Sequence, residues 1–100
     1  MCEFIRVNSQ EVKHKTGYRV YSVGREFLEY KDADVTYKIH SEFGGGLEKN
    51  NIKMYIFTSH LYNNYDQVVI VSEIEKKTIF SKVIKAAKFL TTYPIEIVDE

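Results

Sequence analysis

The chain has 100 residues, which is enough for one domain with its own hydrophobic core and too few for two. Hydrophobic residues make up 44% of the sequence and charged residues 28%, so the composition is that of a globular protein and argues against a disordered one. The 14 basic and 14 acidic residues give a formal net charge of zero. This balance argues against a whole-molecule attraction to nucleic acid or to an anionic membrane, although a local patch could still bind either.

Cysteine content and the N-terminal segment indicate the compartment. Cys2 is the only cysteine, and one thiol can form neither an internal disulfide nor a cysteine-based zinc site. The first residues lack the apolar run of a signal peptide, and no stretch of about 18 apolar residues could span a membrane. We therefore expect a protein of the reducing cytoplasm with no membrane partner. The preference for Lys, Ile, Tyr and Asn, whose codons are rich in A and T, is typical of a low-GC bacterium or of a phage or mobile element that lives in one.

Strand patterns dominate the first half of the chain. Short apolar or alternating segments predict strands at residues 4–7, 18–23 and 35–40. Residues 25–31 contain good helix formers, but the alternation of Leu28 and Tyr30 with polar residues slightly favours a strand there. Residues 42–51 include three consecutive glycines and are typical of a flexible connection.

The next two apolar segments predict a hairpin. Residues 52–57 alternate in the manner of a strand, and residues 68–71 form a short run typical of a strand buried on both faces. Between them, Asn63 and Asn64 are residues that tolerate a positive φ in a turn. We therefore expect the two strands to pair antiparallel around this loop.

The strongest local pattern predicts a helix over residues 73–90. Ser72 and Glu75 have the spacing of a capping box. Apolar residues then recur in one row that is wide enough to face a core: Ile79, Phe80, Val83, Ile84, Ala87 and Leu90. Pro94 follows the helical region, and residues 95–98 could add a short edge strand after it.

Strands that precede a helix, instead of alternating with it, indicate one α+β domain over residues 1–100. We expect a meandering antiparallel sheet of five or six strands, packed on one face by the long C-terminal helix and followed by a short terminal strand. No internal repeat or linker divides the chain.

The glycines and histidines do not form a known catalytic or metal-binding motif. Residues 44–46 are glycines, but the Lys-Ser/Thr pair of a phosphate-binding P-loop does not follow them. His14, His40 and His60 lack the spacing of metal ligands. His40 and His60 could act as an acid–base pair only if the fold brought them together, and two partly exposed histidines on separate elements are the favoured interpretation.

The carboxylates also give no clear site. Glu29, Asp32 and Asp34 could together hold a hard cation, but a polar turn is the commoner explanation for such a cluster. We therefore expect no catalytic residues, no metal and no cofactor, and we favour a non-enzymatic protein.

The loop after residue 57 is the first candidate interaction surface. It is rich in Tyr, Asn, Ser and His, a composition that resembles an antibody paratope. We expect its two tyrosines to be exposed, whereas the alternative is an Asn-rich turn whose tyrosines cover the sheet edge. The predicted partner-binding residues are His60, Tyr62, Asn63, Asn64 and Tyr65.

The polar side of the predicted helix is the second candidate surface. Four lysines lie opposite the apolar row, with Phe89 in the same polar half, and they could contact phosphates. The simpler explanation is a solvated helix face, because lysine is a good exposed helix former. The lysines are Lys77, Lys82, Lys85 and Lys88.

Three functional classes remain open at this point. The leading hypothesis is a protein-binding module, such as a small inhibitor, an immunity-type protein or a phage-encoded modulator, whose partner is another protein; a homodimer is an alternative. The second is a nucleic-acid-binding protein that uses the helix lysines. The zero net charge makes nucleic acid a less favoured partner than protein. The third is a small enzyme or ligand-binding domain whose site forms only in three dimensions.

Overall fold

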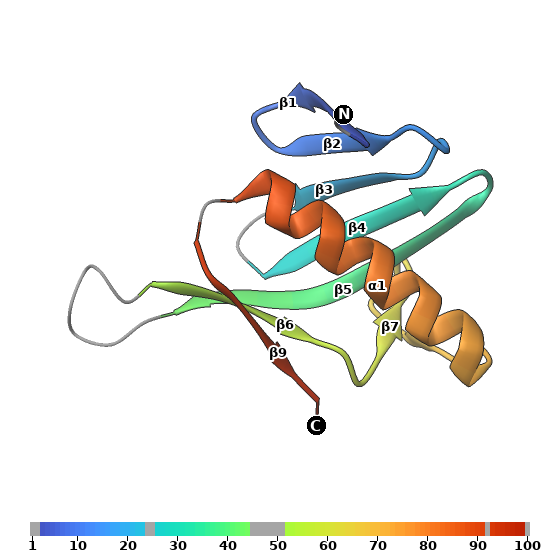
Figure 1. Cartoon of the computed structure of the whole chain (residues 1–100). Helices are drawn as coiled ribbons and strands as arrows, with labels where there is room; N and C mark the ends of the chain where they lie inside the picture. Colours follow the sequence, from blue (N-terminus) through green and yellow to red (C-terminus); the bar gives the residue numbers. More distant parts are fainter. Residues whose placement is uncertain (1–2, 24–25, 45–51, 92, 100) are drawn as a thin grey trace.

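The computed structural model describes residues 3–23, 26–44, 52–91 and 93–99 and has the expected α+β fold (Figure 1). The strands are β1 (Phe4–Asn8), β2 (Glu11–His14), β3 (Arg19–Val23), β4 (Phe27–Asp32), β5 (Val35–Gly44), β6 (Lys53–Phe57), β7 (Leu61–Tyr62), β8 (Val68–Val69) and β9 (Ile95–Val98). The helix α1 spans Glu73–Leu90 and lies between β8 and β9 in the chain. The strand that the alternation slightly favoured at residues 25–31 is present as β4. The strand count exceeds five or six in part because β2 and β7 are too short to give a recognisable alternation.

The strands form one sheet in the order β1-β2-β3-β4-β5-β6-β9. β1 to β5 are an antiparallel meander, as expected. β5 is long enough to pair with β6 through its C-terminal half and with β7 through Lys38, which is aligned with Tyr62. β9 pairs with β6 in parallel, because α1 first crosses back over the sheet. The sheet is therefore mostly, but not wholly, antiparallel.

The predicted hairpin between residues 52–57 and 68–71 is wrong. β6 pairs with β5 and β9, whereas Val68 and Val69 pair with β7. The prediction that this second segment is buried on both faces is also wrong, because Val68 is 52% exposed and Ile70 94% exposed. Only Val69 and Val71 pack against the core. The β-branched run is a two-residue strand at the end of the sheet that leads directly into the helix.

The helix is confirmed over residues 73–90, with the predicted cap. The Ser72 hydroxyl accepts a hydrogen bond from the Glu75 backbone N–H at 3.2 Å. This bond satisfies one of the donors that every helix leaves free in its first turn. At the other end, the Arg6 guanidinium in β1 donates to the Phe89 carbonyl at 2.9 Å and so satisfies an acceptor of the last turn.

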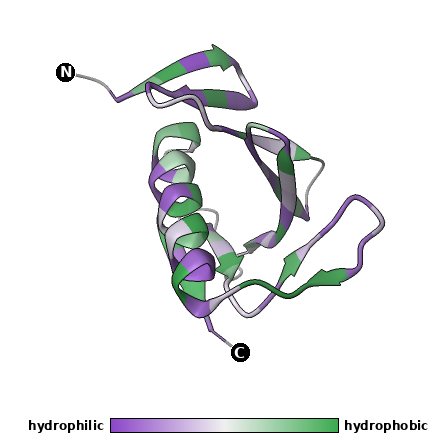
Figure 2. Ribbon diagram, turned by 90° about the vertical axis from the view of Figure 1, so that its right-hand side faces the viewer, coloured by the Kyte–Doolittle hydropathy of each residue, from purple (hydrophilic) through white to green (hydrophobic). Residues whose placement is uncertain are grey.

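One face of the sheet and one side of α1 enclose the core (Figure 2). Fully buried sheet residues include Val12, Val20, Leu28, Ile39 and Ile56. The buried helix residues are Ile79, Phe80, Val83, Ala86 and Ala87, most of them members of the predicted row. No helix in the described part of the chain is long and apolar enough to cross a membrane.

We expect the two sides of α1 to differ sharply in their tolerance of charge. Val83 is fully buried, so Val83→Asp places an unpaired carboxylate in the core and should lower the free energy of unfolding by about 3 kcal/mol or more. Lys85 is exposed, and Lys85→Asp should change that free energy by less than about 1 kcal/mol. Urea or thermal unfolding of both variants tests this, and equal losses would contradict the assigned faces.

We also expect the protein to lose stability in alkali through its buried tyrosines. Burial, followed by the charges of Glu3 and Asp32, raises the pKa of Tyr18 to about 12. Burial and the Asp32 carboxylate, which accepts a 2.9 Å hydrogen bond from the Tyr30 hydroxyl, raise the pKa of Tyr30 well above its usual range. The fold therefore favours the neutral phenols, and their contribution is complete below the unfolded pKa of about 10 and is lost as pH rises toward the folded value.

The measurement is the free energy of unfolding from urea titrations at several pH values between about 9 and about 12. Tyr18→Phe cannot ionise, so its stability should fall less steeply above about pH 10 than that of the unaltered chain. The expectation fails if both proteins lose stability at the same rate over this range.

Candidate functional site

The face of the sheet opposite α1 carries a cluster of aromatic rings. Successive side chains of a strand point to opposite faces, so β5 directs Ile39 into the core and His40 to the other side. Antiparallel register then aligns His40 with Phe27 of β4 and Lys38 with Tyr62 of β7. Three strands therefore place their aromatic side chains on the same uncovered face.

The rings contact one another in a continuous series. His40 stacks on Phe57 at the end of β6, with ring centroids 4.5 Å apart and planes inclined by 19°. Phe27 is 5.8 Å from the His40 ring and 6.3 Å from the Tyr62 ring, which in turn is 6.3 Å from His60. We refer to Phe27, His40, Phe57, His60 and Tyr62 as the aromatic surface. Each of them is at least partly accessible to solvent.

Charged groups lie along this aromatic surface. The Lys38 ammonium is 5.6 Å from the centre of the Phe27 ring and 3.3 Å from the Asp66 carboxylate. His40 Nε2 is 3.2 Å from the Glu42 carboxylate. Both acidic side chains are more than half exposed, so they can still contact a molecule bound beside the rings.

A hollow of about 150 Å³ opens in the aromatic surface. It is lined by His40, Phe57, Ser59, His60 and Tyr62. The fold thus brings His40 and His60 to the same hollow, although they come from a strand and from a loop that is distant in the sequence. This volume accepts a single side chain and is too small for most metabolites.

The β7–β8 hairpin extends this surface. The Asn63 side-chain oxygen accepts hydrogen bonds from the backbone N–H groups of Tyr65 and Gln67, at 2.8 and 3.1 Å. The only positive φ among the described loop residues 63–67 is that of Asp66, at 61°, so neither asparagine uses its tolerance of this conformation. Asn63 instead acts through its side chain, which holds the turn closed. Asn64 is exposed at the tip.

The two tyrosines of this hairpin differ in exposure. Tyr65 at the tip is 83% exposed, as expected. Tyr62 is half-buried, because its ring lies beside Phe27 and His60. Tyr62 is also aligned across the hairpin with Val68, so both side chains lie on the same face and the apolar surface continues onto β8.

The four helix lysines do not form one uniform face. The Lys82 ammonium lies 3.7 Å from the Asp32 carboxylate and 5.2 Å from the centre of the Tyr18 ring, so it faces the sheet. Phe89 is half-buried with its ring 5.7 Å from that of Phe4, so its expected place in the polar half of the helix is wrong. Three of the predicted lysines line a separate groove beside α1: Lys77, Lys85 and Lys88.

The remaining candidates do not converge on a site. Glu29 and Asp32 are three residues apart on β4 and therefore point to opposite faces of the sheet. His14 stacks on Tyr18 and lies 3.6 Å from the Glu3 carboxylate. No group of three metal-ligating side chains occurs among the described residues. Cys2 and two of the three glycines, at positions 45 and 46, lie outside the described residues.

The sequence pattern does not identify Phe27 and Phe57 as parts of this surface. Alternation places Phe27 opposite in direction to Leu28 and Phe57 opposite to Ile56, but it does not show which residues of other strands lie beside the two rings. The signal that identifies them is the register of β4 and β6 against β5, and register depends on contacts between distant parts of the chain.

Comparison of the chain with protein-family models, with curated proteins and with solved structures finds no match in any of the three. The function of the aromatic surface must therefore be inferred from its residues and their geometry.

Proposed function

We propose that this chain is a non-enzymatic protein-binding module whose partner docks on the aromatic surface and on the adjoining β7–β8 hairpin. The observation that carries the proposal is the set of five contacting rings on the sheet face that α1 leaves uncovered. Next to them the Tyr65 ring is 83% exposed. Aromatic side chains of this kind dominate the binding energy of protein interfaces.

The rings are suited to this role because their positions are fixed before binding. Each ring contacts at least one other, and the strands that carry them are paired in the sheet. A partner would therefore lose little side-chain freedom in ordering them, which favours affinity. Lys38, Glu42 and Asp66 would form a charged rim that selects the orientation of the partner.

The hollow gives the surface a specific feature. Its volume of about 150 Å³ matches one inserted side chain, and an aromatic lining favours an apolar or cationic one. A compact chain of 100 residues with such a surface is suited to the role of an inhibitor, an immunity-type protein or a phage-encoded modulator of a cytoplasmic protein.

Nucleic-acid binding is the second candidate function. The observation in its favour is that accessible rings lie beside Lys38, since bases of a single strand can stack on such rings. The helix lysines support it less, because Lys82 faces Asp32 and the groove beside the other lysines also contains Glu73 and Asp99.

We expect Tyr65→Ala to weaken partner binding without unfolding the protein. The side chain is exposed, so the free energy of unfolding should change by less than about 1 kcal/mol. Affinity for the partner should fall by about 2 kcal/mol or more, roughly 30-fold. The measurement uses the tagged full chain to isolate a stoichiometric partner from the source cell, followed by calorimetric titration of each variant.

Tyr93→Ala is the matched control, because Tyr93 is also an exposed tyrosine but contacts Phe43, away from the aromatic surface. It should bind the partner normally. Equal affinities of the Tyr65→Ala and Tyr93→Ala variants would count against the proposed surface. Tyr62→Ala should weaken binding and also cost more stability, because its ring contacts Phe27 and His60.

We further expect no complex with nucleic acid at low salt. Gel-shift assays with a single-stranded oligonucleotide and with a duplex test this directly. A complex whose affinity falls with salt, with a log–log slope of about −0.9 for each duplex phosphate neutralised, would instead favour the second candidate function. Loss of a single-strand complex in Phe57→Ala would assign it to the rings, whereas loss in Lys85→Glu would assign it to the helix.

A further inference from the structure

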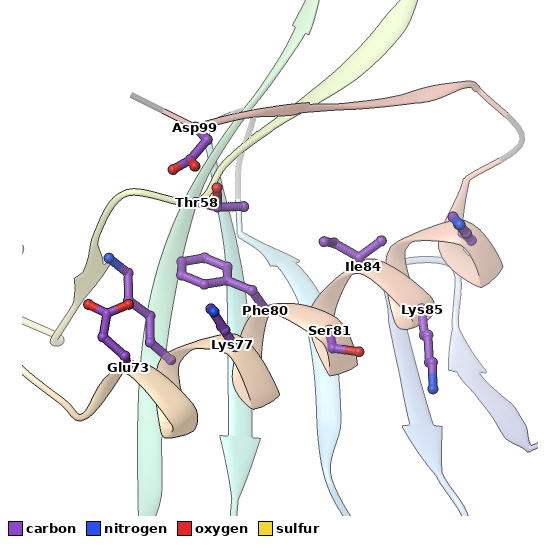
Figure 3. A pocket seen from close by; sticks show the side chains of 10 residues that line it. Thr58, Glu73, Lys77, Phe80, Ser81, Ile84, Lys85 and Asp99 are labelled. Atoms are coloured by element: carbon purple, nitrogen blue, oxygen red, sulfur yellow. The ribbon is translucent and has the colours of Figure 1, made fainter.

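A groove of about 510 Å³ runs between α1 and the end of the chain, separate from the aromatic surface (Figure 3). Its apolar part is formed by Phe80 and Ile84, which point from the helix toward Thr58 and Asp99. The polar residues along it are Glu73, Lys76, Lys77, Ser81, Lys85 and Lys88.

The charge in the groove is uneven. Four lysines line it against two carboxylates, and none of these six groups forms an ion pair with a residue that the structure describes. Glu73 begins the helix, and Figure 3 shows it at the same end of the groove as Asp99. Lys85 and Lys88 belong to the opposite, C-terminal half of the helix. The groove therefore has one basic end and one mixed end.

The strand beside this groove has an unpaired edge. β9 is the last strand of the sheet and, in the described part of the chain, pairs only with β6. The carbonyls of Pro94 and Val98 accept hydrogen bonds from the N–H groups of Met54 and Thr58, at 2.8 and 2.9 Å. Backbone groups alternate in direction along a strand, so the N–H and C=O of Ile95 and Ile97 point away from β6 and remain available to another strand.

We propose that an extended acidic peptide segment of a partner protein binds here, paired with the free edge of β9. Strand addition would supply backbone hydrogen bonds to Ile95 and Ile97. Every second side chain of the added strand would then face the helix side of the sheet. Carboxylates at these positions would be attracted by the lysines that line the groove, and an apolar side chain could contact Ile84.

Charge complementarity favours this occupant over a second copy of the chain. Antiparallel pairing of β9 with its own copy would make one continuous sheet, with both helices on the same side. The lysine-lined flanks of the two helices would then face each other, and their repulsion would oppose assembly. An acidic segment has the opposite sign and gains from the same lysines. This surface is distinct from the aromatic surface, and its occupancy does not depend on the function proposed above.

The test is a nuclear magnetic resonance titration of the ¹⁵N-labelled full chain with a blocked peptide of alternating Glu and Val, Ac-Glu-Val-Glu-Val-Glu-Val-NH₂. We expect the Ile95 and Ile97 amide signals to shift and their hydrogen exchange to slow on binding, with affinity falling as salt rises. The control peptide replaces each Glu by Lys and should not bind. Equal binding of the two peptides would overturn the proposal.

Two variants separate strand pairing from simple charge attraction. Ile97→Pro removes the outward N–H while leaving the bonds to β6 in place, and should weaken binding of the acidic peptide about tenfold or more, whereas Ile97→Val should not. The double variant Lys85→Glu, Lys88→Glu should weaken it by a similar factor. If the peptide binds the Ile97→Pro variant as tightly as the unaltered chain, or if the Ile95 and Ile97 amides remain unprotected in the unaltered chain, strand addition at β9 is wrong.

Two further measurements complete the test. Tyr65→Ala should bind the acidic peptide normally, so failure at one surface is distinguishable from failure at the other. Sedimentation of the free chain should give a monomer, and a dimer that dissociates in the Ile97→Pro variant would show that a second copy, not an acidic segment, occupies the edge.

Discussion

The packing of α1 against one face of the sheet is the constraint on which the other features depend. Val83 and its neighbours bury the inward side chains of the meander, and the N-cap at Ser72 and the Arg6 contact to the last turn fix where this helix begins and ends. A chain of 100 residues with one helix can cover only one face. The opposite face remains open, and the rings directed there become available for contacts with other molecules.

The helix was predictable from the sequence because its determinants are local. An N-cap and an apolar row lie within 19 residues, Ser72 to Leu90; the Ser72 hydroxyl caps the helix, and most of the row is buried. Most strands were also predictable from alternation. The antiparallel meander of neighbouring strands was predictable too, but the pairings between strands distant in the chain were not, as the alignment of Lys38 with Tyr62 and of Met54 with Ile95 illustrates. The β-branched run at residues 68–71 is misleading for the same reason, since burial is decided by what covers a strand.

The candidate site was likewise predictable only where its determinants are local. The composition of the loop predicted two exposed tyrosines, but only Tyr65 is strongly exposed, at the tip of the turn that the Asn63 side chain closes. Tyr62 is half-buried. Phe27 and Phe57 could not be assigned to the surface without the register of three strands. For the helix lysines the local pattern was misleading. A helical wheel places Lys82 with the other lysines, whereas in the structure its ammonium lies beside the Asp32 carboxylate and the Tyr18 ring.

The connection between β6 and β7 has a consequence for how the two surfaces relate to each other. Thr58 lines the groove beside α1, and the next two residues, Ser59 and His60, line the hollow in the aromatic surface. A short link of three residues therefore borders both. An occupant that displaced Thr58 would also move Ser59, and the free energies of occupying the groove and the hollow would then be coupled. Thermodynamic linkage would make such a coupling reciprocal, so that a ligand at either place would change the affinity at the other by the same factor.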